Sequence, residues 1–346
     1  MNLRDHFDVP AQTIVLAEGK FGTTGAKTAN GVVAQSELFD ACAVVDSTNA
    51  GRTAADVLAR DDVDPVPIVS SVEEALENNP DVTALVIGVA PAGGALPESW
   101  KPSIRQAMQN GCHIVSGMHT YLSEDATWQS LAEEYDVTLF DVRKPPEEND
   151  RTIADGSVDD LDCDIVLTLG TDCSVGKRTT TFELYKAAQD AGLDAGWVAT
   201  GQTGIMTGAH RGVAIDGVPA DFTSGIVERM VVEVGREHSL VFVEGQGALT
   251  HRAYSGVTLA ILHGSWPDVA VLADQPDRNR RTHPHFPVEG VEKERALVES
   301  LSDADVVALS TWGEPDAERD KHELPAANIY HENGPQDLLT AVCKHL

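Results

Sequence analysis

Short apolar runs alternate with amphipathic helical patterns along the chain, and the alternation occurs twice. In the first half, runs of four or five residues are separated by segments whose apolar positions recur every three or four residues. This order is typical of parallel strands buried beneath helices on both faces. The predicted strands are Thr13–Ala17, Ala43–Asp46, Val66–Val69, Ala84–Gly88, His113–Ser116 and Val137–Phe140, and the predicted helices are Ala54–Arg60, Val72–Glu77, Ile104–Asn110 and Ala126–Glu134.

The pattern restarts after a polar, acidic and proline-bearing segment at residues 146–163, which predicts a linker. The sequence therefore predicts an α/β protein with two doubly wound, mostly parallel sheets. A Rossmann-like domain at 1–145 precedes a P-loop-like domain at 164–346. The strands expected in the second domain are Ile165–Leu169, Gly196–Thr200, Leu240–Glu244, Val269–Ala273, Val306–Ser310 and Asn328–Tyr330.

A glycine-rich stretch with a lysine joins the first strand of the second domain to a helical pattern. Backbone N–H groups of such a loop converge, and the helix dipole adds positive potential, so the stretch predicts a phosphate site. The alternative, a purely structural turn, does not explain two adjacent cations. The predicted cofactor-binding residues are Gly170, Thr171, Asp172, Cys173, Ser174, Val175, Gly176, Lys177, Arg178 and Thr179.

This loop departs from the common G-x-x-x-x-G-K-[ST] pattern in two ways. Five residues, not four, separate Gly170 from Gly176, and Arg178 stands where a Mg²⁺-binding hydroxyl is usual. An arginine there favours phosphate binding but not Mg²⁺-nucleotide turnover, so we expect no tightly bound metal. Cys173 has two interpretations, a nucleophile with a lowered pKa or, more commonly, a small residue that fits the loop.

Two further strand ends carry polar residues beside glycines. Glu244 ends a predicted strand and precedes Gly-Gln-Gly, which suits a Walker-B-like role or a general base; a buried ion-pair partner is the alternative. Gln202 and Thr203 lie between glycines after another strand and are predicted to give neutral hydrogen bonds to a substrate.

Basic residues gather at two places in this acidic chain. Arg211 follows His210, and the segment Asp277–His285 contains Arg280 and Arg281. Guanidinium groups pair with carboxylates or phosphates, so these three arginines are predicted substrate contacts; salt bridges within the domain are the alternative. His251 and His285 are, with Glu244, the candidate catalytic bases.

The first domain contains a weaker signal. Gly19, Gly22 and Gly25 follow its first strand with the spacing G-x-x-G-x-x-G, and Asp46 ends the next strand. A dinucleotide-binding turn has the spacing G-x-G-x-x-G, so a Rossmann-like domain without a bound dinucleotide is the favoured interpretation.

The composition narrows the classes of partner. The 346 residues include 55 acidic and 25 basic side chains, which gives a formal charge of −30. Such a field excludes nucleic acid and anionic membranes as natural partners. Acid-rich, lysine-poor chains suit a salt-rich cytoplasm, and an ordinary acidic enzyme is the alternative. No apolar run reaches membrane length and the five cysteines form no C-x-x-C pair, so we expect a soluble cytoplasmic protein.

Several motifs together resemble known families. The loop at 170–180, with residues 201–204 and 243–247, is similar to the dethiobiotin-synthetase branch of P-loop proteins. The whole chain more closely resembles a two-domain family that includes the DgcN-type D-glutamate N-acetyltransferases. That resemblance spans roughly residues 14 to 312 and also uses Gly88–Pro91, Gly94, Gly111–His119, Asp141–Pro145 and Glu244–Ala248.

The resemblance implies transfer of the acetyl group of acetyl-CoA to the amine of D-glutamate. The P-loop would then hold the phosphates of CoA, and arginines would bind the carboxylates of a small-molecule substrate. The resemblance leaves two alternatives, an ATP- and Mg²⁺-dependent ligase or kinase like dethiobiotin synthetase and a nucleotide-binding regulator without turnover. Two-domain enzymes of this size commonly associate, so we expect a homo-oligomer.

Overall fold

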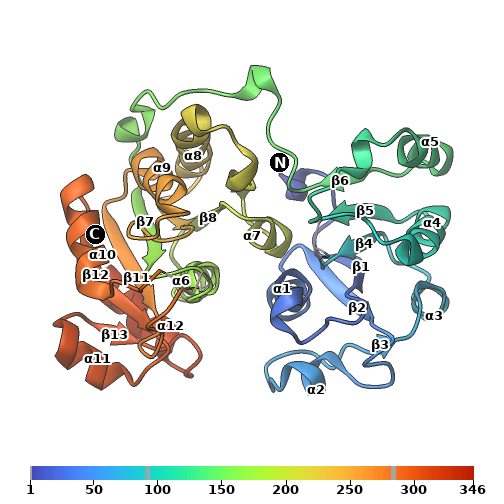
Figure 1. Ribbon diagram of the computed structural model, residues 1–346, viewed down its shortest axis with the longest axis horizontal. Coiled ribbons are helices and arrows are strands. Elements are labelled where there is room, and N and C mark those ends of the chain that lie inside the picture. Colours follow the sequence, from blue (N-terminus) through green and yellow to red (C-terminus); the bar gives the residue numbers. More distant parts are fainter. Residues whose placement is uncertain (1, 90, 92–93, 282–285) are drawn as a thin grey trace. The chain divides into compact units, whose positions relative to one another are not determined.

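A computed structural model describes residues 2–89, 91, 94–281 and 286–346. The chain forms two compact units, one from the N-terminus to Lys144 together with Ile205–Gly208, and one of Pro145–Gly204 with Ala209–Leu346 (Figure 1). Each unit contains a parallel sheet with helices packed against it, so the predicted α/β fold class is confirmed. No helix in the described part of the chain is long and apolar enough to cross a membrane.

The first unit has a Rossmann-like sheet. Its six described strands follow the order β3-β2-β1-β4-β5-β6. Strands β2 and β3 are added on one side of β1, and β4 to β6 are added on its other side, so the switch point of the sheet lies beside β1. The glycine-rich loop after β1 therefore lies at the switch point where such sheets usually bind ligands. The strands are β1 Ala11–Leu16, β2 Phe39–Val45, β3 Ile68–Val69, β4 Ala84–Ile87, β5 His113–Ser116 and β6 Leu139–Asp141, and the helices are α1 Lys27–Gln35, α2 Ala54–Leu58, α3 Val72–Asn78, α4 Lys101–Gln109 and α5 Ala126–Tyr135.

The second unit has a longer parallel sheet. Its described strands follow the order β13-β12-β11-β7-β10-β8-β9, so β7, which carries the predicted P-loop, is central. The strands are β7 Asp164–Gly170, β8 Ala195–Ala199, β9 Arg211–Gly212, β10 Leu240–Glu244, β11 Val269–Asp274, β12 Asp305–Thr311 and β13 Ala326–Ala327. The helices are α6 Lys177–Asp190, α8 Ala220–Gly235, α9 Ser255–Ser265, α10 Val291–Leu301, α11 Pro315–His322 and α12 Gly334–Val342, and α7 Gln202–Thr207 begins in this unit and ends in the first.

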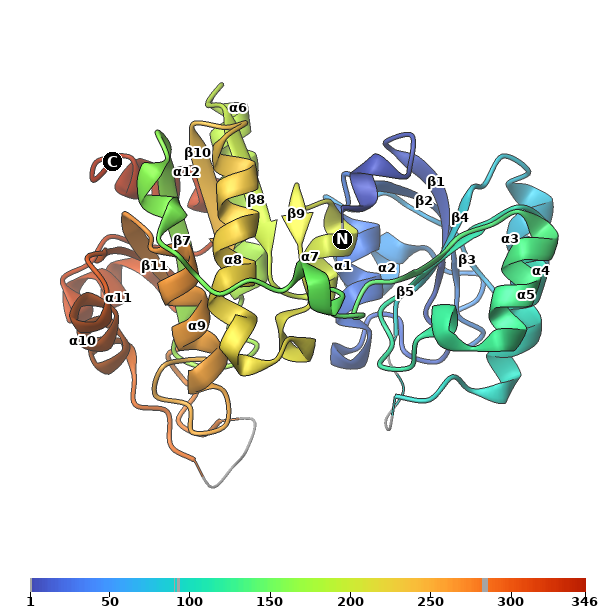
Figure 2. The ribbon, with the colours of Figure 1, turned by 90° about the horizontal axis from the view of Figure 1, so that it is seen from above.

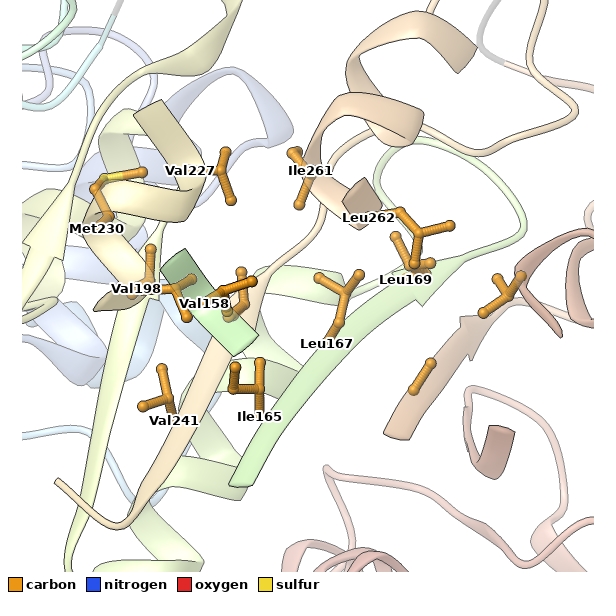
Figure 3. Close-up of a cluster of buried hydrophobic side chains, with 14 of the residues drawn as sticks. Val158, Ile165, Leu167, Leu169, Val198, Val227, Met230, Val241, Ile261 and Leu262 are labelled. Carbon is orange, nitrogen blue, oxygen red and sulfur yellow. The ribbon is translucent and has the colours of Figure 1, made fainter. Parts of the chain in front are cut away.

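Helices cover both faces of this sheet because its strands are apolar on both sides. Trp197 of β8 stacks on Phe182 and Tyr185 of α6, whereas its neighbour Val198 joins the cluster formed with α8 and α9. Successive strand residues point to opposite faces, so α6 and α8 lie on opposite sides, as Figure 2 shows. In Figure 3, the β7 side chains Ile165, Leu167 and Leu169 point toward Val227 of α8 and toward Ile261 and Leu262 of α9.

Two details differ from the sequence prediction. The last strand is Ala326–Ala327, so the strand predicted at Asn328–Tyr330 was wrong: Ile329 and Tyr330 form a turn in which the Tyr330 N–H donates to Asn328 Oδ1. The two-residue strand β9 was not predicted because it is too short for an apolar pattern.

The segment predicted as a linker packs on the second unit. Val158 lies in that unit's core, and Glu228 of α8 accepts the backbone N–H groups of Asp155 and Gly156. Gly225 gives it room, since a Cβ there would lie 2.1 Å from the Thr152 carbonyl oxygen. This segment therefore belongs structurally to the second unit for most of its length.

Candidate functional site

The glycine-rich loop connects β7 to α6 at the carboxyl edge of the second sheet. Its first glycine, Gly170, has no room for a side chain, because a Cβ would lie 2.7 Å from the Ala273 carbonyl oxygen. Ser174 and Gly176 have positive φ angles of 57° and 104°, which turn the chain sharply before α6 begins at Lys177. The predicted strand–loop–helix context is therefore present, with the N-terminus of a 14-residue helix behind the loop.

Two arginines anchor this loop to the protein. Arg278 donates to Cys173 O at 2.6 Å and to Asp172 Oδ2 at 3.2 Å. Arg281 donates to Thr171 O at 3.1 Å and lies 3.5 Å from Asp172 Oδ1. Asp172 is fully buried, so its carboxylate depends on these cations for compensation. The basic segment thus sets the position of the loop.

This arrangement argues against the substrate role predicted for Arg281. Its guanidinium is buried and also donates to Pro287 O and Thr250 Oγ1, so its donors are used within the fold. Arg211 likewise pairs with Glu233 at 2.7 Å and donates to His210 O, as the salt-bridge alternative predicted. Arg280 is exposed and remains a candidate, and His285 lies outside the described residues.

Lys177 lies under the loop, as a phosphate-binding lysine requires. Its ammonium donates to Asp172 O at 2.6 Å and Gly247 O at 2.8 Å, and it has three N–H donors in all. Burial lowers the pKa of Lys177 to about 8, while the nearby Cys173 and Asp172 act to raise it. The ammonium is therefore positioned for an anion and would lose its charge only above about pH 8.

The hydroxyl groups after Lys177 are largely engaged elsewhere. Thr180 Oγ1 is buried and lies 2.7 Å from Ser310 Oγ of β12, and Thr181 Oγ1 donates to Lys177 O. Arg178, half-buried, takes the place of the usual metal-binding hydroxyl. Thr179 is half-buried, and with the hydroxyl groups of Thr180 and Thr181 engaged, the run fits binding of phosphate better than binding of Mg²⁺.

Glu244 is the buried carboxylate beside the loop. It accepts the N–H of Thr200 at 3.1 Å and that of Gly201, and Gln246 Nε2 lies 3.5 Å from it. Burial raises the pKa of Glu244 to about 7, although Arg178, these N–H groups and Lys177 oppose the shift. A carboxyl group with this pKa is suited to proton transfer at neutral pH.

The glycines after β8 make room for this carboxylate. A Cβ at Gly204 would lie 2.6 Å from Glu244 Oε2, and one at Gly201 would lie 2.9 Å from Gln246 Nε2. The N–H of Gly201 bonds Glu244, so this N–H group holds the carboxylate in place. Gln202 and Thr203, half-buried in the first turn of α7, remain candidates for substrate contacts.

His251 lies behind the loop and is fully buried. Its Nδ1 accepts the N–H of Ala253 at 3.1 Å, and its Nε2 lies 3.8 Å from Asp172 Oδ1. With Nδ1 accepting, a neutral ring carries its proton on Nε2, so this geometry does not support His251 as a general base.

Asp172, Cys173 and His251 each have one possible metal-ligand atom within 4.8 Å of the others. The spacing would suit a cation, but Asp172 already pairs with Arg278 and Arg281, and Nε2 of a neutral His251 has no lone pair to give. The chemistry of these donors disfavours a metal, and the expectation of none stays a prediction.

In the first unit, a buried side chain of the same unit binds the N–H groups of the corresponding loop. Asp46, fully buried after β2, accepts the N–H groups of Gly19 at 3.0 Å and Phe21 at 3.1 Å. It also accepts from Thr48 N and Asn49 Nδ2. The N–H groups that would hold a pyrophosphate thus bond a carboxylate, which supports the interpretation without a dinucleotide.

The sequence reasoning missed three residues that shape the site. Arg278 lay in the basic segment but was not singled out. Asp274 ends β11, and its carboxylate accepts the Thr171 hydroxyl at 2.5 Å; burial raises its pKa. Trp312 follows β12 beside Gly176, and only its position after a strand signalled it.

Comparison with known proteins follows the same two-unit division. A model described as a domain of unknown function, DUF1611_N, Rossmann-like, matches residues 47–145. A second, described as DUF1611_C, P-loop domain, matches residues 152–339. The crystal structure of a DUF1611 family protein from Anabaena variabilis is 31% identical, covers 96% of this chain and 99% of that chain, and has a TM-score of 0.86.

Two curated relatives are named D-glutamate N-acetyltransferase. The protein from Pseudoalteromonas is 40% identical over 205 residues, and the match spans 58% of this chain and 60% of the relative, less than two thirds of its length. The protein from Tritonibacter scottomollicae is 36% identical over 277 residues, which are 75% of this chain and 81% of the relative.

Proposed function

Because this chain belongs to the DUF1611 family, with two relatives named D-glutamate N-acetyltransferase, we propose that it acetylates the amine of D-glutamate from acetyl-CoA. The observation that most directly supports acetyl-CoA as the acetyl donor is that the P-loop has an arginine in place of the metal-binding hydroxyl. CoA carries its pyrophosphate and 3′-phosphate without needing Mg²⁺, so Lys177, Arg178 and the start of α6 fit this ligand.

The proposed base is Glu244, since burial raises its pKa to about 7. The substrate ammonium first loses one proton to solvent. Glu244 then takes a second proton as the nitrogen attacks the thioester carbon, and it returns this proton to the CoA sulfur as the C–S bond breaks. Glu244 and the phosphate loop are neighbours, so this step requires the pantetheine arm to fold back toward the end of β10.

The groups proposed to recognise the substrate are fewer than the sequence suggested. Arg281 and Arg211 are engaged within the second unit, so of the residues predicted from the sequence we propose Arg280, Gln202 and Thr203 for the two carboxylates.

The test is release of free CoA from acetyl-CoA by the purified chain in molar salt, with D-glutamate as acceptor and L-glutamate as the matched control. We expect D-glutamate-dependent CoA release and a product heavier by one acetyl group. Absence of release with D-glutamate and with a panel of amino acids would reject the proposal. ADP release that depends on Mg²⁺ and substrate would instead support the ligase or kinase alternative.

A further inference from the structure

Two exposed aromatic side chains stand at the same edge of the second sheet as the phosphate loop. Trp312, directly after β12, is 43% exposed, and Tyr330, after β13, is 54% exposed. Their ring centroids are 5.9 Å apart at an interplanar angle of 86°, so one ring supports the other edge to face. We call Trp312 and Tyr330 the aromatic pair.

The aromatic pair is fixed next to the phosphate loop. A Cβ on Gly176 would lie 3.0 Å from Trp312 Nε1, so the indole lies against the glycine that precedes Lys177. The backbone of Trp312 donates to Asp274 O at 3.1 Å, and the N–H of Tyr330 donates to Asn328 Oδ1 at 3.0 Å. Hydrogen bonds therefore fix the backbone of both residues, that of Trp312 to the last residue of β11 and that of Tyr330 to the residue after β13.

This position suits the base of a nucleotide. When a phosphate is held at the start of α6, the base lies only one ribose away, and an exposed indole at that distance offers a stacking surface. A surface hollow is lined by Glu314, Asn328 and His331, each one or two positions from the pair in the chain, and their side chains carry oxygen and nitrogen acceptors of the kind that an exocyclic amine needs.

From these contacts we propose that Trp312, supported by Tyr330, stacks on the adenine ring of the acetyl donor. The inference rests on the proposed function in one respect, that the donor is acetyl-CoA. In this proposal the aromatic pair selects CoA over shorter acyl donors. The phosphate loop contributes the electrostatic part of the binding free energy.

The experiment compares two donors, acetyl-CoA and S-acetyl-4′-phosphopantetheine, which lacks the adenosine and two of the three phosphates of CoA. Affinities are measured by calorimetry for Trp312→Ala, Trp312→Phe and Tyr330→Ala. We expect Trp312→Ala to weaken acetyl-CoA binding about 5- to 100-fold. Trp312→Phe should keep most of the affinity, Tyr330→Ala should lose less than Trp312→Ala, and no variant should change binding of the shorter donor.

The matched control is Trp266→Ala. Trp266 is also exposed, at 37%, but it lies after α9 at the amino edge of the sheet, so its loss should leave both affinities unchanged. Equal loss for both donors in Trp312→Ala, or no loss for either, would overturn the inference. A change of oligomeric state in Trp312→Ala with unchanged affinity would also overturn it, because the pair would then be an interface.

Failure of the proposed function has a different signature. If the wild-type chain binds neither donor but binds ADP, and Trp312→Ala weakens ADP, the stacking surface stands and the acetyl-CoA proposal falls. If acetyl transfer is observed and Lys177→Ala weakens acetyl-CoA while Trp312→Ala does not, only the stacking surface falls.

Discussion

Both units place a glycine-rich loop after a strand at the switch point of a parallel sheet, yet the two loops differ in what their surroundings offer a ligand. In the first unit, Asp46 fills the loop by accepting the N–H groups of Gly19 and Phe21. In the second, the carboxylate of Asp172 pairs with Arg278 and Arg281, and the ammonium group of Lys177 lies beneath the loop.

The carboxylates on the neighbouring strands show the same contrast. Asp46, after β2, accepts four N–H groups, whereas Glu244, at the end of β10, is buried with a pKa raised to about 7. The topology of a parallel sheet puts a loop and a carboxylate together at the switch point. The hydrogen-bond partners of that carboxylate then decide whether it stabilises the loop or is suited to proton transfer.

Glu244→Gln should have the largest effect. If Glu244 is the base, kcat/KM should fall 10²- to 10⁴-fold at pH 8. In the wild type, kcat/KM should rise most steeply below about pH 7, where the Glu244 carboxyl and the substrate ammonium both lose a proton, and should level off above about 8, where Lys177 loses its proton. The variant should lose the inflection near pH 7 and keep only the rise caused by deprotonation of the substrate, measured by CoA release from pH 5 to 10.

The control for this profile is Asp46→Asn, which removes the corresponding carboxylate of the first unit. It should keep the inflection near pH 7. An inflection near pH 7 that persists in Glu244→Gln would assign the base to another group.

Arg281→Ala comes next, because it leaves Asp172 with one cation fewer in a buried position. Removing one partner of a buried ion pair costs about 3–5 kcal/mol. Hydrogen exchange of the β7 and β11 amides measures this loss locally. Arg280→Ala, next in sequence but exposed, should change stability by less than about 0.5 kcal/mol. Unchanged protection in Arg281→Ala, with a raised KM for D-glutamate, would restore the substrate role.

Lys177→Ala should weaken acetyl-CoA binding by about 1.5–3 kcal/mol, roughly 10- to 100-fold, because a charge-assisted phosphate contact is lost. Lys20→Ala is the matched control, since Lys20 lies exposed in the glycine-rich loop of the first unit. Calorimetry should show no change for Lys20→Ala. Equal losses in both variants would mean that the two loops do not differ as we infer.

Asp46→Asn should have the smallest effect on function. It weakens four hydrogen bonds to a charged acceptor, so the loop after β1 should lose about 1–3 kcal/mol of protection at Gly19 and Phe21. Acetyl-CoA affinity should stay unchanged. A nucleotide that binds the wild type and is lost in this variant would show that the first loop holds a ligand after all.

Much of the fold followed from the sequence. The alternation of apolar strands with helical patterns predicted two parallel sheets, and most predicted strands overlap observed ones, because fully buried strands need continuous apolar runs. The exceptions were β9 and β13 at the two edges of the second sheet, whereas β3, equally short, lies within the predicted strand Val66–Val69. β9 and β13 have two residues each, and pairing with a neighbour rather than their own pattern defines them.

For the site, too, part could be predicted from the sequence and part could not. The sequence by itself determined the phosphate loop and the carboxylate at the end of β10, because glycine, lysine and glutamate at strand ends identify themselves by type and spacing. Tertiary structure alone decided that Arg281 holds Asp172, that Asp46 occupies the first loop, and that Trp312 lies against Gly176. Each of these pairs joins residues from different strand ends, 27 to 136 positions apart in the chain, so only the closing of the sheets brings them together.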